Sequence, residues 1–125
     1  MIAEIIAQLK TGAISNVVPF GSATPSTTPY VVVKPETYTK GRGLRIILHY
    51  KQGANMYVSG GVTHTPMDDY IYNVLPGLLS EWTMTNNHGE SITVHDTGEI
   101  TDITAVSDDN TIAMERLFYI SMLPY

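Results

Sequence analysis

Histidines and carboxylates are the side chains of this sequence whose types and spacing come nearest to metal binding or acid–base chemistry. His88, His95 and Asp96 lie close together along the chain, and His64 precedes an aspartate pair at 68–69. A metal site needs two or three such ligands to converge, and none of these follows the His-x-x-x-His spacing of a helical zinc site. Histidines in turns and on half-exposed strands are ordinary. The sequence therefore favours neither a metal nor another cofactor.

Serine-based hydrolysis is the second chemistry that the residues allow. The Gly-x-Ser-x-Gly motif of a nucleophile elbow does not occur. Ser59, beside Gly60 and Gly61 and close to His64, is the best candidate for a nucleophile, although a glycine-hinged loop explains the same residues. The chain has no cysteine, which excludes disulfides, thiolate catalysis and cysteine zinc sites together. We therefore expect no enzyme.

The composition indicates one small domain with few charges. The chain has 125 residues, a length typical of a single domain, so 1–125 is taken as one unit. Charged residues make up 15%, below the roughly 25% of an ordinary soluble domain, which is consistent with another subunit covering part of the surface. The net charge of −5 and the thinly spread basic residues argue against a primary nucleic-acid binder.

Targeting and membrane signals are not found in the sequence. The segment 1–4 lacks the charged and apolar regions of a signal peptide. No stretch reaches the roughly 18 apolar residues that a membrane span needs. The lack of cysteine suits a reducing cytosol. We expect a soluble protein made in the cytoplasm, with no membrane partner.

The first half of the chain predicts a helix followed by strands. Ile2, Ile5, Ile6 and Leu9 recur at helical spacing, and Gly12 ends the helix. The elements predicted next are a loop at 15–29, a strand at 30–33, a turn at 41–43, a strand at 44–50, a possible short strand at 56–58 and a flexible break at 59–61.

The second half opens with the clearest helix start in the chain. Thr65 fits the N-cap, Pro66 fits the first helical position, and apolar spacing carries the helix to Trp82. Pro76-Gly77 predicts a kink or a division into two shorter helices. The elements predicted after it are a turn at 86–89, strands at 91–95 and 98–106, a turn at 108–110 and a closing strand at 115–123.

The predicted order indicates an α+β fold. Its mostly antiparallel sheet is flanked by a short N-terminal helix and a longer central helix. The apolar run 117–120 is unsuited to an exposed edge, so the last strand is expected to be central or covered by a partner.

Three short motifs mark three of these predicted elements. They are Thr28-Pro29-Tyr30-Val31-Val32-Val33 in the first strand region, Thr65-Pro66-Met67-Asp68-Asp69 at the helix start and Glu115-Arg116-Leu117-Phe118-Tyr119-Ile120 in the closing strand. With the short first helix and the Pro/Ser/Thr loop, the arrangement resembles the tail terminator (tail completion, head–tail joining) proteins of tailed bacteriophages. The resemblance spans most of the chain, and it departs from the family's order at Gly60-Gly61 and at Pro76-Gly77.

The resemblance implies a structural protein of the virion, located in the tail or neck. Such a protomer assembles into a homo-oligomeric ring, usually a hexamer. The ring contacts the tail tube protein on one side and the head connector protein on the other. DNA passes through its lumen without sequence-specific binding, and the acidic charge balance agrees with such a lumen.

Contacts between protomers are expected where apolar side chains adjoin flexible or terminal segments, because a monomer has little to cover them there. Tyrosine, of which the chain has eight, is also favoured at subunit interfaces. The predicted interface residues are Met56, Tyr57, Val58, Met122, Leu123 and Tyr125. Simple core packing explains the same residues equally well.

Three alternatives stay open at this point. A head–tail connector or stopper protein of the neck would share the size and the ring, and would differ in its partner. A small hydrolase or metal-binding enzyme would use His88, His95 and Asp96. A stand-alone ligand-binding domain would be a stable monomer with a closed apolar pocket.

Overall fold

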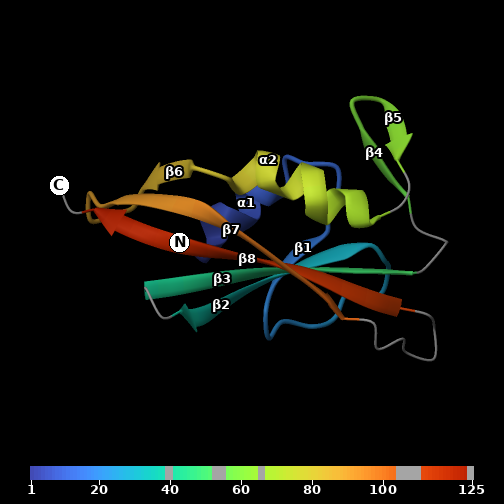
Figure 1. Ribbon diagram of the computed structural model, residues 1–125, viewed down its shortest axis with the longest axis horizontal. Coiled ribbons are helices and arrows are strands. Elements are labelled where there is room, and N and C mark those ends of the chain that lie inside the picture. The colour runs from blue at the N-terminus through green and yellow to red at the C-terminus, as the bar shows by residue number, and fades with distance from the viewer. Residues whose placement is uncertain (39–40, 52–55, 65–66, 104–110, 124–125) are drawn as a thin grey trace.

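The computed structural model describes the backbone of residues 1–38, 41–51, 56–64, 67–103 and 111–123. In this part of the chain, a six-stranded sheet has the strand order β1-β2-β3-β8-β7-β6 (Figure 1). The strands are, in that order, β1 (Val17–Pro19), β2 (Tyr30–Tyr38), β3 (Gly41–Lys51), β8 (Thr111–Leu123), β7 (Ser91–Ile103) and β6 (Trp82–Thr85). β1 runs parallel to β2, and the other neighbours are antiparallel. The predicted α+β fold class is confirmed.

Helical segments cover one face of this sheet (Figure 1). They are α1 (Ile2–Leu9), the π-helical segment η1 (Tyr70–Val74) and α2 (Leu75–Leu79). The apolar stripe of α1 is turned inward, since Ile5 and Leu9 are fully buried. The Nε2 group of Gln8 donates to the carbonyl of Leu78 at 2.9 Å, which ties α1 to α2.

The central helix changes its hydrogen-bonding pattern next to Pro76. The N–H of Leu75 donates to the carbonyl of Tyr70, five residues back, and α2 begins there. Pro76 has no N–H, and it lies in the first turn of α2, where a helix requires none. The predicted division of the helix is therefore confirmed, whereas its predicted start at 65–66 lies outside the described residues.

The helix is shorter than the sequence predicted. Its expected continuation to Trp82 is wrong, because Trp82 begins β6. Ser80 is extended and Glu81 has a φ of 58°, so two successive residues leave the helical conformation. The apolar spacing persists through this break because Trp82 still packs against the core from the sheet.

The two faces of the sheet are occupied differently. Leu44, Ile46 and Leu48 of β3 are fully buried under the helices, on what we call the covered face. The alternate residues, Arg45 and Ile47 among them, point to the opposite side and are partly exposed. This opposite side, called the open face below, is the side of the sheet away from the helices.

Three further predictions of local structure were wrong. The segment 15–29, predicted as a loop, contains β1, which is only three residues long. The segment 41–43, predicted as a turn, belongs to β3. The strands predicted at 91–95 and 98–106 form a single strand, β7, as far as Ile103. The predicted turn at 108–110 lies outside the described residues, and the central position of the closing strand is confirmed.

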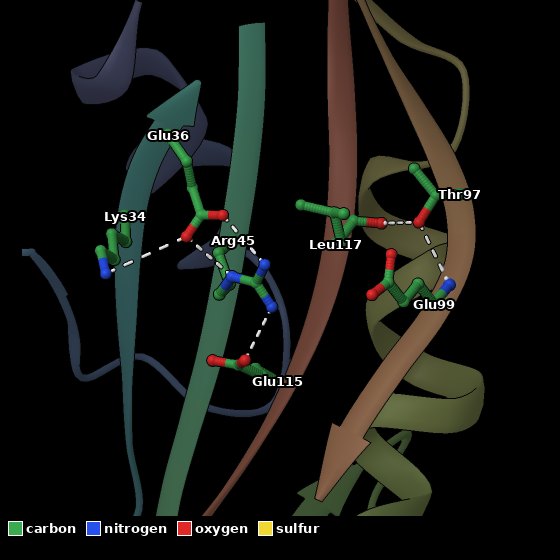
Figure 2. A network of polar contacts seen from close by, with 7 residues as sticks. All are labelled: Lys34, Glu36, Arg45, Thr97, Glu99, Glu115 and Leu117. Atoms are coloured by element: carbon green, nitrogen blue, oxygen red, sulfur yellow. Dashed lines mark hydrogen bonds and ion pairs between the residues drawn. The ribbon is translucent and has the colours of Figure 1, made fainter. Parts of the chain in front are cut away.

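A β-bulge explains why the sequence of β7 predicted two separate strands. The register shifts between Asp96 and Ile100, and Gly98 takes a φ of 77°, which suits glycine. The Asp96 carboxylate accepts the N–H of Gly98 at 2.9 Å. Thr97 Oγ1 donates to the Leu117 carbonyl at 2.6 Å and accepts the N–H of Glu99 at 3.1 Å (Figure 2). These bonds hold the irregular segment against β8.

A hairpin of β4 (Tyr57–Ser59) and β5 (Val62–His64) projects beyond the helices at one end of the molecule (Figure 1). Gly60 and Gly61 form its turn with φ values of 59° and 80°, the left-handed conformation that a two-residue hairpin turn requires. The predicted short strand is confirmed, shifted by one residue, and a turn at Gly60-Gly61 follows it, whereas Ser59, predicted in the break, belongs to β4.

The hairpin is attached to the helix layer through Tyr57. Its side chain is 3% exposed and meets the ring of Tyr70 edge to face at 6.0 Å. Its hydroxyl donates to the carboxylate of Asp69, which also accepts from Asn73. The hairpin is thereby fixed at its base.

Arg116 connects the helix layer to the sheet from the covered face. Its side chain is 8% exposed and donates to both carboxylate oxygens of Asp96, at 2.9 and 2.6 Å. A third bond, at 3.1 Å, reaches the carbonyl of Ile71 in η1. Burial by itself raises the pKa of Asp96, but the hydrogen bonds from Arg116 and the Gly98 N–H outweigh it and hold that pKa below its ordinary value.

We predict that Arg116→Met lowers the free energy of unfolding by about 3 kcal/mol, the lower end for a buried pair, because the partly buried Asp96 carboxylate loses its charged partner. Urea unfolding followed by circular dichroism measures the change. Arg42→Met, at an exposed arginine of β3, serves as the control and is expected to cost less than about 0.5 kcal/mol. The double variant Asp96→Asn/Arg116→Met should recover much of the loss. A cost for Arg116→Met as small as that of Arg42→Met would contradict the proposed anchor.

Candidate functional site

A charged ladder crosses three strands of the open face. Arg45 of β3 donates to both carboxylate oxygens of Glu36 on β2, at 2.8 and 2.9 Å, and to Glu115 on β8, at 2.7 Å. Lys34 lies 4.0 Å from Glu36. Figure 2 shows the guanidinium of Arg45 between the two carboxylates. The two carboxylates raise the pKa of Arg45, the hydrogen bond to Glu36 contributing most.

An apolar groove lies beside this ladder on the open face. Its volume is about 660 Å³, and it is bounded by the segment 18–25 and by β2, β3 and the start of β8. Val32, Ile47 and Ile112 form part of its lining, and Phe20, which is 61% exposed, stands at its wall. Among the described residues of the lining there is no lysine, arginine, aspartate or glutamate.

Aromatic and cationic side chains shape the groove. The rings of Tyr30 and His49 are stacked at 4.6 Å within its lining, and burial lowers the pKa of His49. The ammonium of Lys34 lies 4.8 Å from the centroid of the Phe20 ring, a cation–π distance. The groove therefore offers aromatic contact area, with one positive charge near Phe20.

The projecting hairpin and the adjoining helix carry a second group of exposed apolar side chains. Met56 is 57% exposed, Val62 on β5 is 58% exposed, and Tyr72 on η1 is 52% exposed. Large exposed apolar side chains on a small protein are typical of a contact surface. This surface and the groove are built from different parts of the chain.

The predicted interface residues divide into three groups. Met56 is exposed, whereas Tyr57 is buried in the core of its own protomer and Met122 packs partly against that core. Val58 lies in β4 and Leu123 in β8, with side chains outside the described set. Tyr125 lies outside the described residues. Contacts between protomers at these positions stay a prediction.

The histidines and carboxylates that suggested chemistry are not brought together. His88 is exposed in the turn after β6, where its N–H donates to Asn86. His95 points to the open face, and Asp96 points to the covered face, where it binds Arg116. Among the described residues, no group of three or more histidine and carboxylate side chains could hold a metal ion.

The residues around the predicted serine site have other positions. Ser59 and His64 pair with the opposite strand of the hairpin through β4 and β5, and their side chains lie outside the described set. Asp69 holds Tyr57, as described above. Within the described part of the protein, one oxygen of Asp68 and the hydroxyl of Tyr70 are buried without a hydrogen-bond partner.

The structure also contains a polar cluster that the sequence did not reveal. His95 contacts Glu81 through Nδ1 at 3.0 Å and Ser121 through Nε2 at 2.7 Å. Glu81 and Ser121 are 14 and 26 residues away from His95 in the sequence, and only the strand order β6-β7-β8 brings them together. No local spacing could have identified them.

None of the helices in the described part of the chain has the length and apolar character of a membrane span. Comparison of the chain with protein-family models, with curated proteins and with solved structures gives no match. Its function is therefore inferred from the surfaces described above.

The Arg45–Glu36 pair makes stability depend on pH. The hydrogen bond from Arg45 lowers the pKa of Glu36 from its ordinary 4.5. A carboxylate whose pKa is lower in the folded state stabilises the fold above its unfolded pKa, and this contribution is lost as the pH falls below about 4.5.

We predict that Glu36→Gln lowers the free energy of unfolding by about 0.5–1 kcal/mol near neutral pH, as for a partly exposed ion pair. The difference from the unsubstituted protein should shrink as the pH falls from about 5 towards 3. Urea unfolding over this pH range measures it. Glu99→Gln, at an exposed glutamate of β7, is the matched control. A difference for Glu36→Gln that stays constant with pH would contradict the role given to the Arg45 pair.

Proposed function

We propose that this chain is the protomer of a homo-oligomeric ring that ends the tail tube of a tailed bacteriophage and joins it to the head connector. The observation that carries the proposal is the presence of two different exposed apolar surfaces on one small protomer. One comprises Val62 on the projecting hairpin with Met56 before β4 and Tyr72 on η1, and the other is the groove beside Phe20. The order of elements and the motifs that resemble tail terminator proteins supply the biological setting.

Two different surfaces favour a ring over a simple dimer. A two-fold dimer buries the same patch on both subunits, whereas a contact between two unlike patches repeats head to tail and closes into a ring when the rotation allows it. The hairpin projects from the side of the sheet that carries the helices (Figure 1). The groove lies on the open face. The projecting surface of one protomer would contact the groove of the next.

The character of the two surfaces suits such a contact. The described lining of the groove has no carboxylate, lysine or arginine, and its one histidine is His49. Residues 56–64 likewise have no such group, and their one histidine is His64. Burying the two surfaces against each other leaves no carboxylate, lysine or arginine without a partner, which would be costly at an interface. The exposed aromatic side chains Phe20 and Tyr72 are of the kind that is enriched at interfaces.

The arrangement of charges agrees with a lumen through which DNA passes. Arg45 is held between two carboxylates, and Arg116 is buried against Asp96, so these two cations are compensated within the protomer. The whole chain carries a net charge of −5. Binding of the phosphate backbone needs several clustered cations, so we expect no retention of DNA.

A head–tail connector or stopper protein is the neighbouring possibility, since it would use the same ring. The partner distinguishes the two functions. Purified tail tubes should bind this protein if it is a terminator, and head connectors alone should bind it if it is a stopper. Co-sedimentation with each, followed by electron microscopy of the tube ends, separates them.

We predict that Phe20→Asp and Val62→Asp each block assembly, because a charge placed in an apolar contact weakens it by about 30-fold or more. Light scattering on a size-exclusion column, with negative-stain images of the same peak, measures the assembly. The unsubstituted protein should form closed rings, alone or on tail tubes. Thr85→Asp, at an exposed position of β6, is the control and should assemble normally.

Mixing the two variants tests the head-to-tail arrangement itself. Each variant keeps one intact surface, so an equimolar mixture of Phe20→Asp and Val62→Asp should form a heterodimer through the one undamaged pair and no ring. A monomeric protein that neither assembles nor binds tail tubes would refute the ring. Normal ring formation by both variants would remove these two surfaces from the interface.

A further inference from the structure

A serine, a histidine and a glutamate form one continuous chain of polar contacts on the open face. Ser121 lies on β8, His95 on β7, and Glu81 in the bend between α2 and β6. The Ser121 hydroxyl is 2.7 Å from Nε2 of His95, and Nδ1 of the same ring is 3.0 Å from the Glu81 carboxylate. This chain of contacts has the geometry of a catalytic triad, in which Ser121 is the nucleophile, His95 the base and Glu81 the carboxylate that orients the base.

The glutamate fixes which nitrogen of the histidine can act as a base. An ionised carboxylate only accepts hydrogen bonds, so Nδ1 of His95 carries the proton that Glu81 binds. In the neutral ring Nε2 is then unprotonated, and it accepts the hydroxyl proton of Ser121. This is the tautomer that a general base for Ser121 requires.

The backbone and the neighbouring ring hold these groups in place. Glu81 has a φ of 58°, unusual for a residue other than glycine, and its N–H donates to the carbonyl of Val94 at 2.8 Å. That bond places Glu81 beside the residue that precedes His95. The ring of Tyr119 stacks on the His95 ring at 4.5 Å with an angle of 18° between their planes.

The site is accessible to a small molecule. The side chain of His95 is 22% exposed and that of Glu81 is 70% exposed. Thr93 lies opposite Ser121 in the β7–β8 register, and its hydroxyl is 3.2 Å from that of Thr83. One of these two hydroxyls donates to the other, and the second proton is a donor of the kind that stabilises a developing oxyanion.

We infer that Ser121 is a nucleophile, activated by His95 and oriented by Glu81, that accepts acyl groups from small esters reaching the open face. Ser121 Oγ attacks the ester carbonyl carbon while Nε2 of His95 takes the hydroxyl proton. The imidazolium returns that proton to the departing alcohol as the ester C–O bond breaks, which leaves an acyl-Ser121. A water molecule, deprotonated by His95, hydrolyses this acyl group and restores Ser121 with release of the carboxylic acid.

This activity is independent of the proposed ring. The triad uses the β6-β7-β8 side of the sheet, whereas the groove lies at β2, β3 and the 18–25 segment. Ring assembly can therefore fail while Ser121 reacts, and the reverse can also hold.

The test is covalent labelling of the full-length protein with diisopropyl fluorophosphate, which phosphorylates activated serines and releases fluoride. We expect one adduct per chain, located at Ser121 by peptide mass spectrometry, together with turnover of p-nitrophenyl acetate. Ser121→Ala should abolish the adduct, and Ser91→Ala, at a serine of β7 outside the triad, should keep it. His95→Gln should slow labelling by about 100-fold or more, the usual contribution of a general base.

The pH profile separates an activated nucleophile from an ordinary reactive surface serine. Labelling of the unsubstituted protein should depend on pH, and this dependence should vanish in His95→Gln. Glu81→Gln should slow labelling with a smaller effect, as expected for a positioning residue. Circular dichroism checks the fold of each variant. Absence of an adduct at Ser121, or labelling unaffected by His95→Gln, would overturn the inference.

Discussion

The arrangement of the helices on the sheet depends on the hydrogen bonds that the Arg116 side chain makes. Apolar burial favours a helix layer on the sheet but does not fix its position, because the hydrophobic effect is not directional. The guanidinium of Arg116 adds direction, since one planar group binds Asp96 on the neighbouring strand and the carbonyl of Ile71 in η1. A π-helical turn leaves backbone carbonyls in an irregular pattern. Arg116 binds one of them and anchors η1 where the hairpin also attaches.

The same strand serves the two faces of the sheet. Arg116 and Phe118 of β8 point to the covered face, and Glu115 and Ser121 point to the open face. A strand in the centre of a sheet can do this because its backbone groups are paired on both edges, so its side chains alone decide what each face presents. β8, which is paired along both edges, consequently contributes Glu115 to the charged ladder and Ser121 to the Glu81–His95–Ser121 cluster.

The sequence was sufficient for the elements whose signal is local. The apolar stripe of α1, the alternation along β3 and the interruption at Pro76 follow from periods of 3.6 and 2 and from the missing N–H of proline. β1 and β6 were missed because they are short edge strands that bury few side chains. β7 was divided at Gly98 because an isolated glycine signals a turn as readily as a bulge. The contacts of His95 with both Glu81 and Ser121 depend on strand order, which no local pattern specifies.

The bulge in β7 shows how such non-local geometry decides what the open face presents. Between the pairs Asp96–Phe118 and Ile100–Arg116, the three residues 97–99 of β7 lie opposite the single residue Leu117 of β8. β7 thus has two residues more than its partner, and an even number leaves the alternation of side chains unchanged on either side of the bulge. One extra residue would have placed Ile100, which packs against the core, on the open face. The part of β7 beyond the bulge therefore keeps its apolar side on the covered face because the bulge adds two residues and not one.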